Sequence, residues 1–517
     1  MVEGNEKFDF DGLFILEMAN NHGGSVEHGK RIMEAYAPIV ARAGVRAAIK
    51  FQLRDLDTFI HPAFKNSAEY KHIPRFLSTR LSDEQFKELI DKARELDFYV
   101  MATPFDEASV DTIERLGVDV IKVASSSSAD WPLLEKISQA GKPVVASTGG
   151  LATAEVDNLV SFFEHRGVDF AIMHCVSRYP TPLHEANLRR IRMFTLRYPS
   201  ITIGYSTHED PGTTDGIKVS YSLGARIFEK HIGLPQEGVS LNAYSASPEQ
   251  FERWLNAYHD VVTMIGDESS SYGEKDNEVE KEELRLQMRG LYAKRPIAKG
   301  QVITRDDVFF AMPLQVGQVR SGRWRVGLVA DNDYASNDPI SEGILPTAIS
   351  KKYIIYRVVH EVKGILRSAN IPVTTESSVT LQHPFGIETY FSAGFAYLDV
   401  CMVGDCMKRL LVFLSGQMYP KHYHTKQERI LQVLSGEIIV DLDGREKTLY
   451  SGDTILIPGG VWHAFKTLQK NAVVEELSPL REGDHIHFVD KEIDRKSKEE
   501  RETKLIYWGR HQFDAEP

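Results

Sequence analysis

The 517-residue sequence predicts three domains: an α/β TIM barrel, a small β-rich domain and an all-β barrel. The length itself suggests about three domains of roughly 150 residues each. Over the first 265 or so residues, short apolar runs alternate with amphipathic helical patterns. From about residue 375 onward, the pattern changes to short, evenly spaced strands separated by turn residues, which is typical of a β-barrel or jelly roll.

Eight strand–helix units in about 250 residues are the pattern of a TIM barrel. Most of the apolar runs are rich in Val, Ile and Phe, as expected for strands that are buried on both faces. The runs are 13–19, 45–52, 98–103, 119–125, 143–148, 169–175, 201–206 and 225–231. The alternative is a doubly wound open sheet, which is disfavoured because no Gly-rich dinucleotide-binding turn is present.

The rest of the chain divides by composition. Residues 1–266 form the predicted barrel, and the polar, charge-dense segment 267–289 is a predicted linker. Short β-like runs within 290–345 predict a compact β-rich domain. We expect a connecting segment over 346–374 and the all-β barrel over 375–517.

Composition excludes several classes of protein. Apolar residues make up 42% and charged residues 26%, which is ordinary for a globular protein and excludes wholesale disorder. No window approaches about 18 consecutive apolar residues, so we expect no membrane partner. The polar N-terminus and only three cysteines predict a cytoplasmic setting. A net charge of −12 argues against a general nucleic-acid partner.

Polar residues end nearly every predicted barrel strand. TIM-barrel active sites are built at the C-terminal ends of the strands, so these residues define a candidate site. They are Glu17, Lys50, Gln52, Thr103, Lys122, Ser125, Ser147, Thr148, His174, Cys175, Ser206, His208, Glu229, Lys230 and His231. Two lysines together with several hydroxyl groups suit an anionic phosphate or carboxylate ligand.

His208 and His231 follow the seventh and eighth strands, which are neighbours in a closed barrel. Two imidazoles at this place can share one divalent metal. Such a site leaves positions open for water and substrate oxygen, which suits a catalytic metal. The alternative is a pair of independent hydrogen-bonded histidines.

Together these motifs resemble the sialic acid synthase family. The resemblance covers about 1–345, and 290–345 is similar to the family's antifreeze-protein-like (SAF) domain. The motifs are FILEMANNHGG (14–24), IKFQ (49–52), ATPFD (102–106), IKVAS (121–125), ASTGG (146–150), MHCVSRYPTP (173–182), IGYSTHEDP (203–211) and FEKHIG (228–233).

The resemblance implies condensation of phosphoenolpyruvate with a sugar aldehyde, which gives a nonulosonic acid and phosphate. It implies Mn²⁺ or another divalent metal at His208 and His231, and a homodimer in which the SAF domain of one subunit caps the partner's barrel. The implied catalytic residues are Glu17, Lys50, Lys122, His208 and His231. The implied substrate-binding residues are Gln52, Thr103, Ser125, Ser147, Tyr179 and Ser206.

The departures from the family pattern lie on the acceptor side. Ser177 and Ser127 stand where the family usually has Asn and an acidic residue, and Ala243 stands at an expected Asp. Met312 stands at the SAF-domain Arg, and Arg320 and Arg323 lie near enough in the sequence to substitute for it. We therefore predict an acceptor other than N-acetylmannosamine.

A second motif pair lies downstream. GQMYPKHYHTKQE (416–428) and GDTILIPGGVWHAF (452–465) resemble the paired motifs of cupin barrels. The implied ligands are His422, His424, Glu428 and His463, a set suited to Mn, Fe, Ni or Zn. The first motif also resembles sugar-isomerase cupins, which implies a sugar ligand. The alternative is a cupin that has lost catalysis and only binds sugar or dimerises.

Three functions stay open at this point. The main prediction is a synthase that joins phosphoenolpyruvate to a sugar aldehyde. The others are a cupin sugar isomerase or epimerase with an ancillary barrel, and a non-catalytic carbohydrate sensor. The lysine and histidine pairs of the barrel argue against the sensor.

Overall fold

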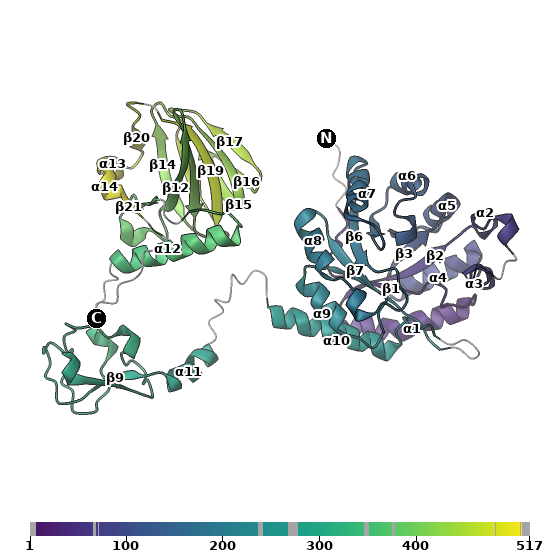
Figure 1. Cartoon of the computed structure of the whole chain (residues 1–517), viewed down its shortest axis with the longest axis horizontal. Coiled ribbons are helices and arrows are strands. Elements are labelled where there is room, and N and C mark those ends of the chain that lie inside the picture. Colours follow the sequence, from purple (N-terminus) through teal and green to yellow (C-terminus); the bar gives the residue numbers. More distant parts are fainter. Residues whose placement is uncertain are drawn as a thin grey trace. The chain divides into compact units, whose positions relative to one another are not determined.

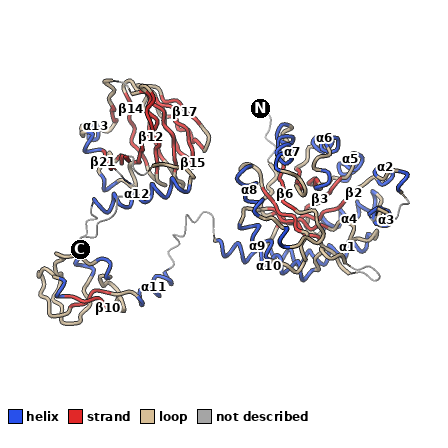
Figure 2. Tube along the Cα trace, viewed as in Figure 1, coloured by secondary structure: helices blue, strands red, loops and turns tan. Residues whose placement is uncertain are grey.

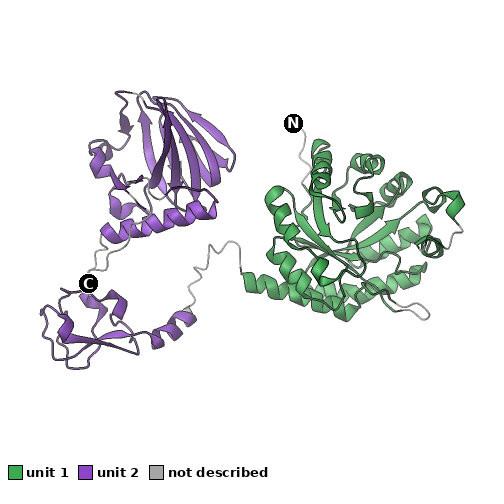
Figure 3. Ribbon diagram, in the orientation of Figure 1, with its two compact units in different colours: residues 1–275 green, residues 276–517 purple. Residues whose placement is uncertain are grey.

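The computed structural model describes residues 7–65, 69–70, 72–235, 241–266, 278–345, 351–374, 378–480, 482–506 and 508. The chain divides into two compact units, 1–275 and 276–517, which are described separately below (Figure 3). Within the described ranges, no helix combines the length and apolar character needed to cross a membrane.

The first unit confirms the predicted TIM barrel. Eight parallel strands close in sequence order, and helices surround them (Figures 1 and 2). The strands are β1 (Leu13–Glu17), β2 (Arg46–Leu53), β3 (Tyr99–Pro104), β4 (Val120–Val123), β5 (Val144–Ser147), β6 (Phe170–Cys175), β7 (Ile203–Thr207) and β8 (Ile227–His231). The helices are α1 (Val26–Ala43), α2 (Leu56–Phe59), α3 (His72–Ser78), α4 (Asp83–Glu95), α5 (Glu107–Leu116), α6 (Trp131–Gln139), α7 (Thr153–His165), α8 (Arg189–Arg197), α9 (Asp215–Ser222) and α10 (Pro248–Ile265).

Local chemistry explains where the helices begin. At α4, the Ser82 hydroxyl accepts from the Gln85 backbone N–H at 3.3 Å. The Gln85 side-chain oxygen accepts from the Ser82 N–H at 2.9 Å, so two N–H groups that the helix leaves unpaired are satisfied. The apolar face of α4 then buries Phe86, Leu89 and Ile90 against the barrel.

Side-chain alternation divides the barrel strands into an inner and an outer layer. The inner cluster takes alternate positions of the strands: Leu13, Ile15, Ala48, Met101, Val120, Val145, Ala171, Met173 and Ile227, with Phe10. The intervening positions, such as Phe14, Ile49 and Phe228, pack with the helices. Because the period is two residues, the next inward positions toward the C-terminal ends lie at the barrel mouth.

The second unit contains the predicted small β-rich domain. Helix α11 (Glu278–Gln287) lies in the predicted linker, of which residues 267–277 fall outside the described residues. Strands β9 (Gly290–Ala293) and β10 (Val308–Ala311) pair antiparallel. Isolated bridges such as Val302–Val329 and Ile297–Tyr334 join the two halves of 290–345.

The remainder of the second unit is a curled antiparallel sheet, which confirms the predicted cupin barrel. Its main strand order is β20-β14-β18-β15-β19-β13-β12-β11-β21, with β16 and β17 paired to β15. The strands are β11 (Ser378–Gln382), β12 (Phe395–Val403), β13 (Cys406–Phe413), β14 (Met418–His424), β15 (Arg429–Leu442), β16 (Arg445–Tyr450), β17 (Thr454–Ile457), β18 (His463–Lys466), β19 (Ala472–Pro479), β20 (Ile486–Phe488) and β21 (Glu502–Ile506). Two short helices, α13 (Lys491–Asp494) and α14 (Lys498–Arg501), precede β21.

The segment 346–374, predicted as a connection, contains helix α12 (Lys351–Ser368). Val358 and Val362 of this helix are fully buried in one cluster with Leu381 and Leu398 of the sheet. The helix therefore belongs to the core of the cupin barrel, and the prediction of a mere connection was wrong in this respect.

Gly436 in β15 provides a test of this packing. Its φ is +79°, and a Cβ there would lie 1.8 Å from the Asn471 carbonyl oxygen. Gly444 has a similar φ of +89° with open space around it. We expect Gly444→Ala to lower the free energy of unfolding of the cupin by about 1–2 kcal/mol. Gly436→Ala should cost about 1–3 kcal/mol more because of the clash.

Urea unfolding, monitored by hydrogen exchange of the backbone amides of β15 and β19, measures the loss of unfolding free energy in both variants. Equal losses for the two variants would contradict the close approach of Asn471 to Gly436.

Candidate functional site

The inward positions at the C-terminal ends of the barrel strands carry the predicted site residues. Seven of them lie two or four positions beyond an inner-layer residue of the same strand. The eighth, Ser206, pairs with Glu229, which lies two positions beyond Ile227. The eight residues are Glu17, Lys50, Gln52, Thr103, Lys122, Ser147, Ser206 and His231. The fold therefore brings these eight predicted residues together at one mouth.

A buried charge cluster forms the floor of this mouth. The Glu229 carboxylate lies 2.9 Å from Lys50 Nζ and 4.0 Å from Lys122 Nζ, and these side chains are at most 5% exposed. Lys50 also pairs with Glu17. Burial lowers the pKa of Lys50 to about 8, although the Glu229 charge opposes this change. Burial opposes ionisation of Glu229, but the charges of Lys50 and Lys122 outweigh it and lower the pKa of this carboxyl.

Hydroxyl groups line the cluster. Lys122 Nζ donates to Ser147 Oγ, and Ser206 Oγ donates to Glu229 at 2.9 Å. Thr103 Oγ1 is buried without a protein partner in the described part of the chain. These groups and the two lysines are hydrogen-bond donors that suit an anionic ligand.

The loop after β5 lies close to the same place. The Gly149 N–H donates to Ser125 Oγ at 3.0 Å, and Cys175 Sγ lies 3.0 Å from that hydroxyl. A Cβ on Gly149 would come within 2.5–2.8 Å of Ser177, Cys175 and Ser125 side-chain atoms. Glycine at this position therefore lets the backbone approach the mouth closely.

The two predicted metal ligands are neighbours, with His208 and His231 ring centroids 5.3 Å apart and ring planes tilted by 51°. His208 Nδ1 donates to the Val176 carbonyl at 2.9 Å, which leaves its Nε2 lone pair available. His231 Nδ1 is buried and has no partner among the described residues. Burial lowers the pKa of His208 to about 4 and that of His231 well below its usual value, so both rings are neutral, as metal ligands must be.

Within the described ranges, no group of three or more His, Cys, Asp or Glu side chains is arranged to hold a metal ion. The two imidazoles fit a metal whose other ligands are water and substrate oxygen. Aromatic rings border this pair. Tyr179 lies 4.1 Å from His208, and Tyr244 lies 4.9 Å from His231 and 5.1 Å from Tyr179, centroid to centroid.

Two strand-end residues point away from the mouth. His174 occupies an outward position and its Nε2 donates to the Ala186 carbonyl at 2.7 Å. Lys230 is also outward, 5.2 Å from the Trp254 ring centroid. Glu229 was predicted from the sequence as a strand-end residue of the site but was given no role there. Tyr244 was missed, because no sequence pattern marks it.

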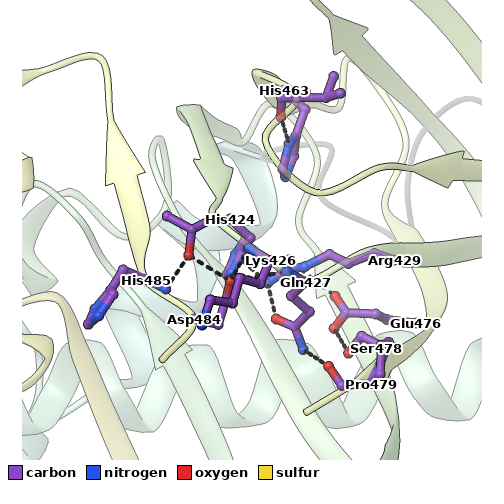
Figure 4. A network of polar contacts seen from close by, with 12 residues as sticks. His424, Lys426, Gln427, Arg429, His463, Glu476, Ser478, Pro479, Asp484 and His485 are labelled. Carbon is purple, nitrogen blue, oxygen red and sulfur yellow. Dashed lines mark hydrogen bonds and ion pairs between the residues drawn. The ribbon is translucent and has the colours of Figure 1, made fainter. Parts of the chain in front are cut away.

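The cupin sheet holds a second group of histidines, His422, His424 and His463, of which Figure 4 labels the last two. The ring centroid of His422 lies 4.2 Å from that of His463 and 5.8 Å from that of His424. Each Nδ1–H donates to a fixed acceptor: Pro420 O and Val461 O at 2.9 Å, and Asp484 Oδ2 at 2.8 Å. These bonds place the protons on Nδ1, so all three Nε2 atoms are acceptors. Imidazole nitrogens suit a divalent transition metal. As placed here, however, Arg429 occupies His424 Nε2, and the described part of the chain holds no three such side chains arranged around a metal position.

Glu428 does not join this cluster. Its side chain is exposed, whereas its neighbours Gln427 and Arg429 are buried. Arg429 donates to His424 Nε2 and pairs with the buried Glu476. The assignment of Glu428 as a metal ligand is therefore not kept. Asp484, which orients His424, was missed because it lies sixty residues away in a loop with no motif.

The charge cluster at the barrel mouth provides a stability test. Glu229→Gln leaves Lys50 and Lys122 buried with less compensation, so we expect a loss of about 3–5 kcal/mol at pH 7. Because the folded pKa of Glu229 is lowered, its contribution is present above the unfolded value of about 4.5 and is lost as the pH falls below it. Urea unfolding at several pH values measures both effects.

Glu252→Gln is the matched control. Glu252 pairs with Arg42 at 2.7 Å on the surface, so its loss should cost less than about 1 kcal/mol. Similar losses for both variants, or a loss at Glu229 that does not shrink in acid, would contradict the proposed cluster energetics.

Comparison with known proteins adds family information. Residues 39–270 match the model of the NeuB family, and 409–475 match that of the cupin domain. An uncharacterized protein of Methanocaldococcus jannaschii is 34% identical over 308 residues, which are 58% of this chain and 85% of that protein. N,N'-diacetyllegionaminic acid synthase of Campylobacter jejuni is 26% identical over 64% of this chain and 99% of its own length. A crystal structure from Chromobacterium violaceum, provisionally assigned as spore coat polysaccharide biosynthesis protein E, is 44% identical with a TM-score of 0.59 and covers 64% of this chain and 98% of that chain.

Proposed function

Because the chain belongs to the NeuB family, we propose that its barrel condenses phosphoenolpyruvate with a sugar aldehyde to give a nonulosonic acid and phosphate. The observation that carries this proposal is the composition of the barrel mouth. Two buried lysines pair there with Glu229, and two neutral histidines lie next to each other. The similarity to N,N'-diacetyllegionaminic acid synthase of Campylobacter jejuni, whose name gives a sugar acid as its product, supports this type of reaction.

The phosphoenolpyruvate side is assigned to the cations and hydroxyl groups of the mouth. Lys50 and Lys122 supply positive charge, which is strengthened by burial. The hydroxyl-bearing residues Thr103, Ser125, Ser147 and Ser206 supply hydrogen bonds to the phosphate or carboxylate oxygens. Glu229 holds both lysines and Ser206 in place.

The acceptor side is assigned to Tyr179 and Glu17, whereas Gln52 is assigned to phosphoenolpyruvate. In the reaction, C3 of phosphoenolpyruvate bonds to the aldehyde carbon, water adds at C2, and phosphate leaves with cleavage of its C–O bond. A proton must reach the former aldehyde oxygen, and another must leave the water. We assign this exchange to Glu17, which pairs with Lys50 and accepts from Gln52 Nε2 at 3.4 Å.

His208 and His231 would hold a divalent metal such as Mn²⁺, which supplies Lewis-acid polarisation of the acceptor aldehyde. The acceptor is proposed to differ from N-acetylmannosamine. We also propose a cytoplasmic homodimer in which the two subunits exchange their 290–345 domains. The proposed domain limits are those predicted from the sequence, with α12 added to the cupin.

For the cupin, we propose that His422, His424 and His463 hold Mn, Fe, Ni or Zn, and that the pocket binds or modifies a sugar. The Nδ1 atoms of these three histidines, each held by a protein acceptor, favour this over a purely structural domain. The same observation supports a sugar isomerase or epimerase as the second candidate function.

Phosphate release tests the barrel reaction. The full chain, supplied with phosphoenolpyruvate, Mn²⁺ and a panel of aldoses, should release phosphate with at least one aldose. The double variant His208→Ala/His231→Ala should be at least about 100-fold slower because metal assistance is lost. His184→Ala removes a histidine whose side chain is 80% exposed, and should leave the rate unchanged. No release with any aldose would contradict synthase activity.

The independence of the two sites is tested with the double variant His422→Ala/His424→Ala. We expect its rate of phosphate release to stay within about twofold of the parent, because the barrel mouth contains its own donors. Circular dichroism confirms folding. A well-folded double variant that has lost condensation would show that the cupin takes part in it.

A further inference from the structure

Arg54 lies two residues beyond Gln52, at the rim of the barrel mouth. It follows β2, and Nη2 of its guanidinium donates to Gln52 Oε1 at 3.0 Å. The guanidinium carbon lies 3.6 Å from the ring centroid of Phe105, which follows β3, and 4.1 Å from that of Phe76 in α3. Such cation–π contacts hold a planar guanidinium in one orientation. Two rings from other parts of the chain therefore fix the donor that reaches Gln52.

The Arg54 guanidinium is charged and has few polar partners. Burial lowers its pKa to about 10, although the Asp106 charge opposes this change, so Arg54 stays charged at pH 7. Its Nε–H is buried and has no hydrogen-bond partner within the described residues. The Asp106 carboxylate accepts from the backbone N–H groups of Asp55 and Ser109, at 2.9 and 2.8 Å. A buried donor without a partner costs stability, which is typical of a residue kept for function.

The two neighbours of the Gln52 side-chain amide determine which way it faces. A guanidinium has only donors, so the amide oxygen must face Arg54. The Glu17 carboxylate has only acceptors, so the amide nitrogen must face Glu17, where Nε2 donates to Oε1 at 3.4 Å. The amide has two N–H groups, and this contact uses one of them. The second N–H is left for a ligand, so Gln52 presents a donor to the mouth.

We propose that Arg54 is a positioning residue of the barrel site, which fixes the Gln52 amide so that its N–H groups face Glu17 and the phosphoenolpyruvate. Phosphoenolpyruvate is an anion, and only the donor end of an amide binds its oxygen atoms. Without Arg54, one of the two constraints on the amide is lost, and the amide oxygen can turn toward the ligand and repel it. The inference rests on the proposed function, which assigns Gln52 to phosphoenolpyruvate.

Binding of phosphoenolpyruvate to the full chain, measured by calorimetry in the presence of Mn²⁺, tests this role. Arg54→Met keeps a long apolar side chain against Phe76 and Phe105 but removes the donors. We expect it to bind phosphoenolpyruvate about 10-fold more weakly, with a similar loss in Gln52→Ala. The double variant Arg54→Met/Gln52→Ala should stay within about twofold of Gln52→Ala alone, because Arg54 acts through Gln52.

Arg166→Met is the matched control, because it also removes a guanidinium that lies on an aromatic ring. Arg166 lies 3.7 Å from the Phe162 ring centroid, and its Nε donates to Glu135 at 3.0 Å, away from the mouth. Its loss should leave the affinity unchanged. Arg54→Lys keeps the charge but lacks the planar group, so it should recover only part of the affinity. It replaces Arg54→Met in the comparison with Gln52→Ala if Arg54→Met does not fold.

Three results would overturn the proposal. The first is unchanged affinity for phosphoenolpyruvate in the Arg54 variants. The second is additive losses in the double variant, as expected if Arg54 only stabilises the fold or binds the ligand itself. The third is full affinity in Arg54→Lys, which would show that the charge alone is sufficient. A parent chain that binds no phosphoenolpyruvate would contradict the proposed function and this inference together, whereas the three results above leave the proposed function standing.

Discussion

The strict alternation of side chains along the strands of a closed parallel barrel is the constraint on which the barrel site depends. Every second residue must fit inside, and the inner layer is apolar up to Ile15, Met101 and Ile227. At the next inward position, two residues further along several strands, charged side chains replace the apolar ones. Buried charges are tolerated there only because they are paired, and Glu229 provides the pairing for lysines on two other strands.

The same alternation organises the cupin site. His422 and His424 are two residues apart on β14, so both face the interior of the sheet. Fixed acceptors on each Nδ1 then determine which nitrogen carries the proton. In both sites burial lowers the histidine pKa values, which keeps the rings neutral and available as ligands.

The two sites differ in how they provide positive charge. The barrel mouth uses lysines, which act as compact charges on flexible stems, whereas the cupin has a planar guanidinium that is paired with Glu476. The lysines suit oxygen anions, although the chain as a whole carries a charge of −12. Local cations inside pockets of low polarity explain how an acidic protein can attract anionic ligands.

The sequence by itself determined the barrel, the cupin sheet and most of the strand-end residues, because these follow from local periodicity and short motifs. Lys50, Lys122 and His231 could be identified because each ends an apolar run. Only the tertiary structure decided that Lys230 and His174 point outward, that Arg429 instead of Glu428 reaches His424, and that distant Asp484 and α12 belong to the cupin. These outcomes depend on strand register and on contacts between residues far apart in the chain, which local patterns do not encode.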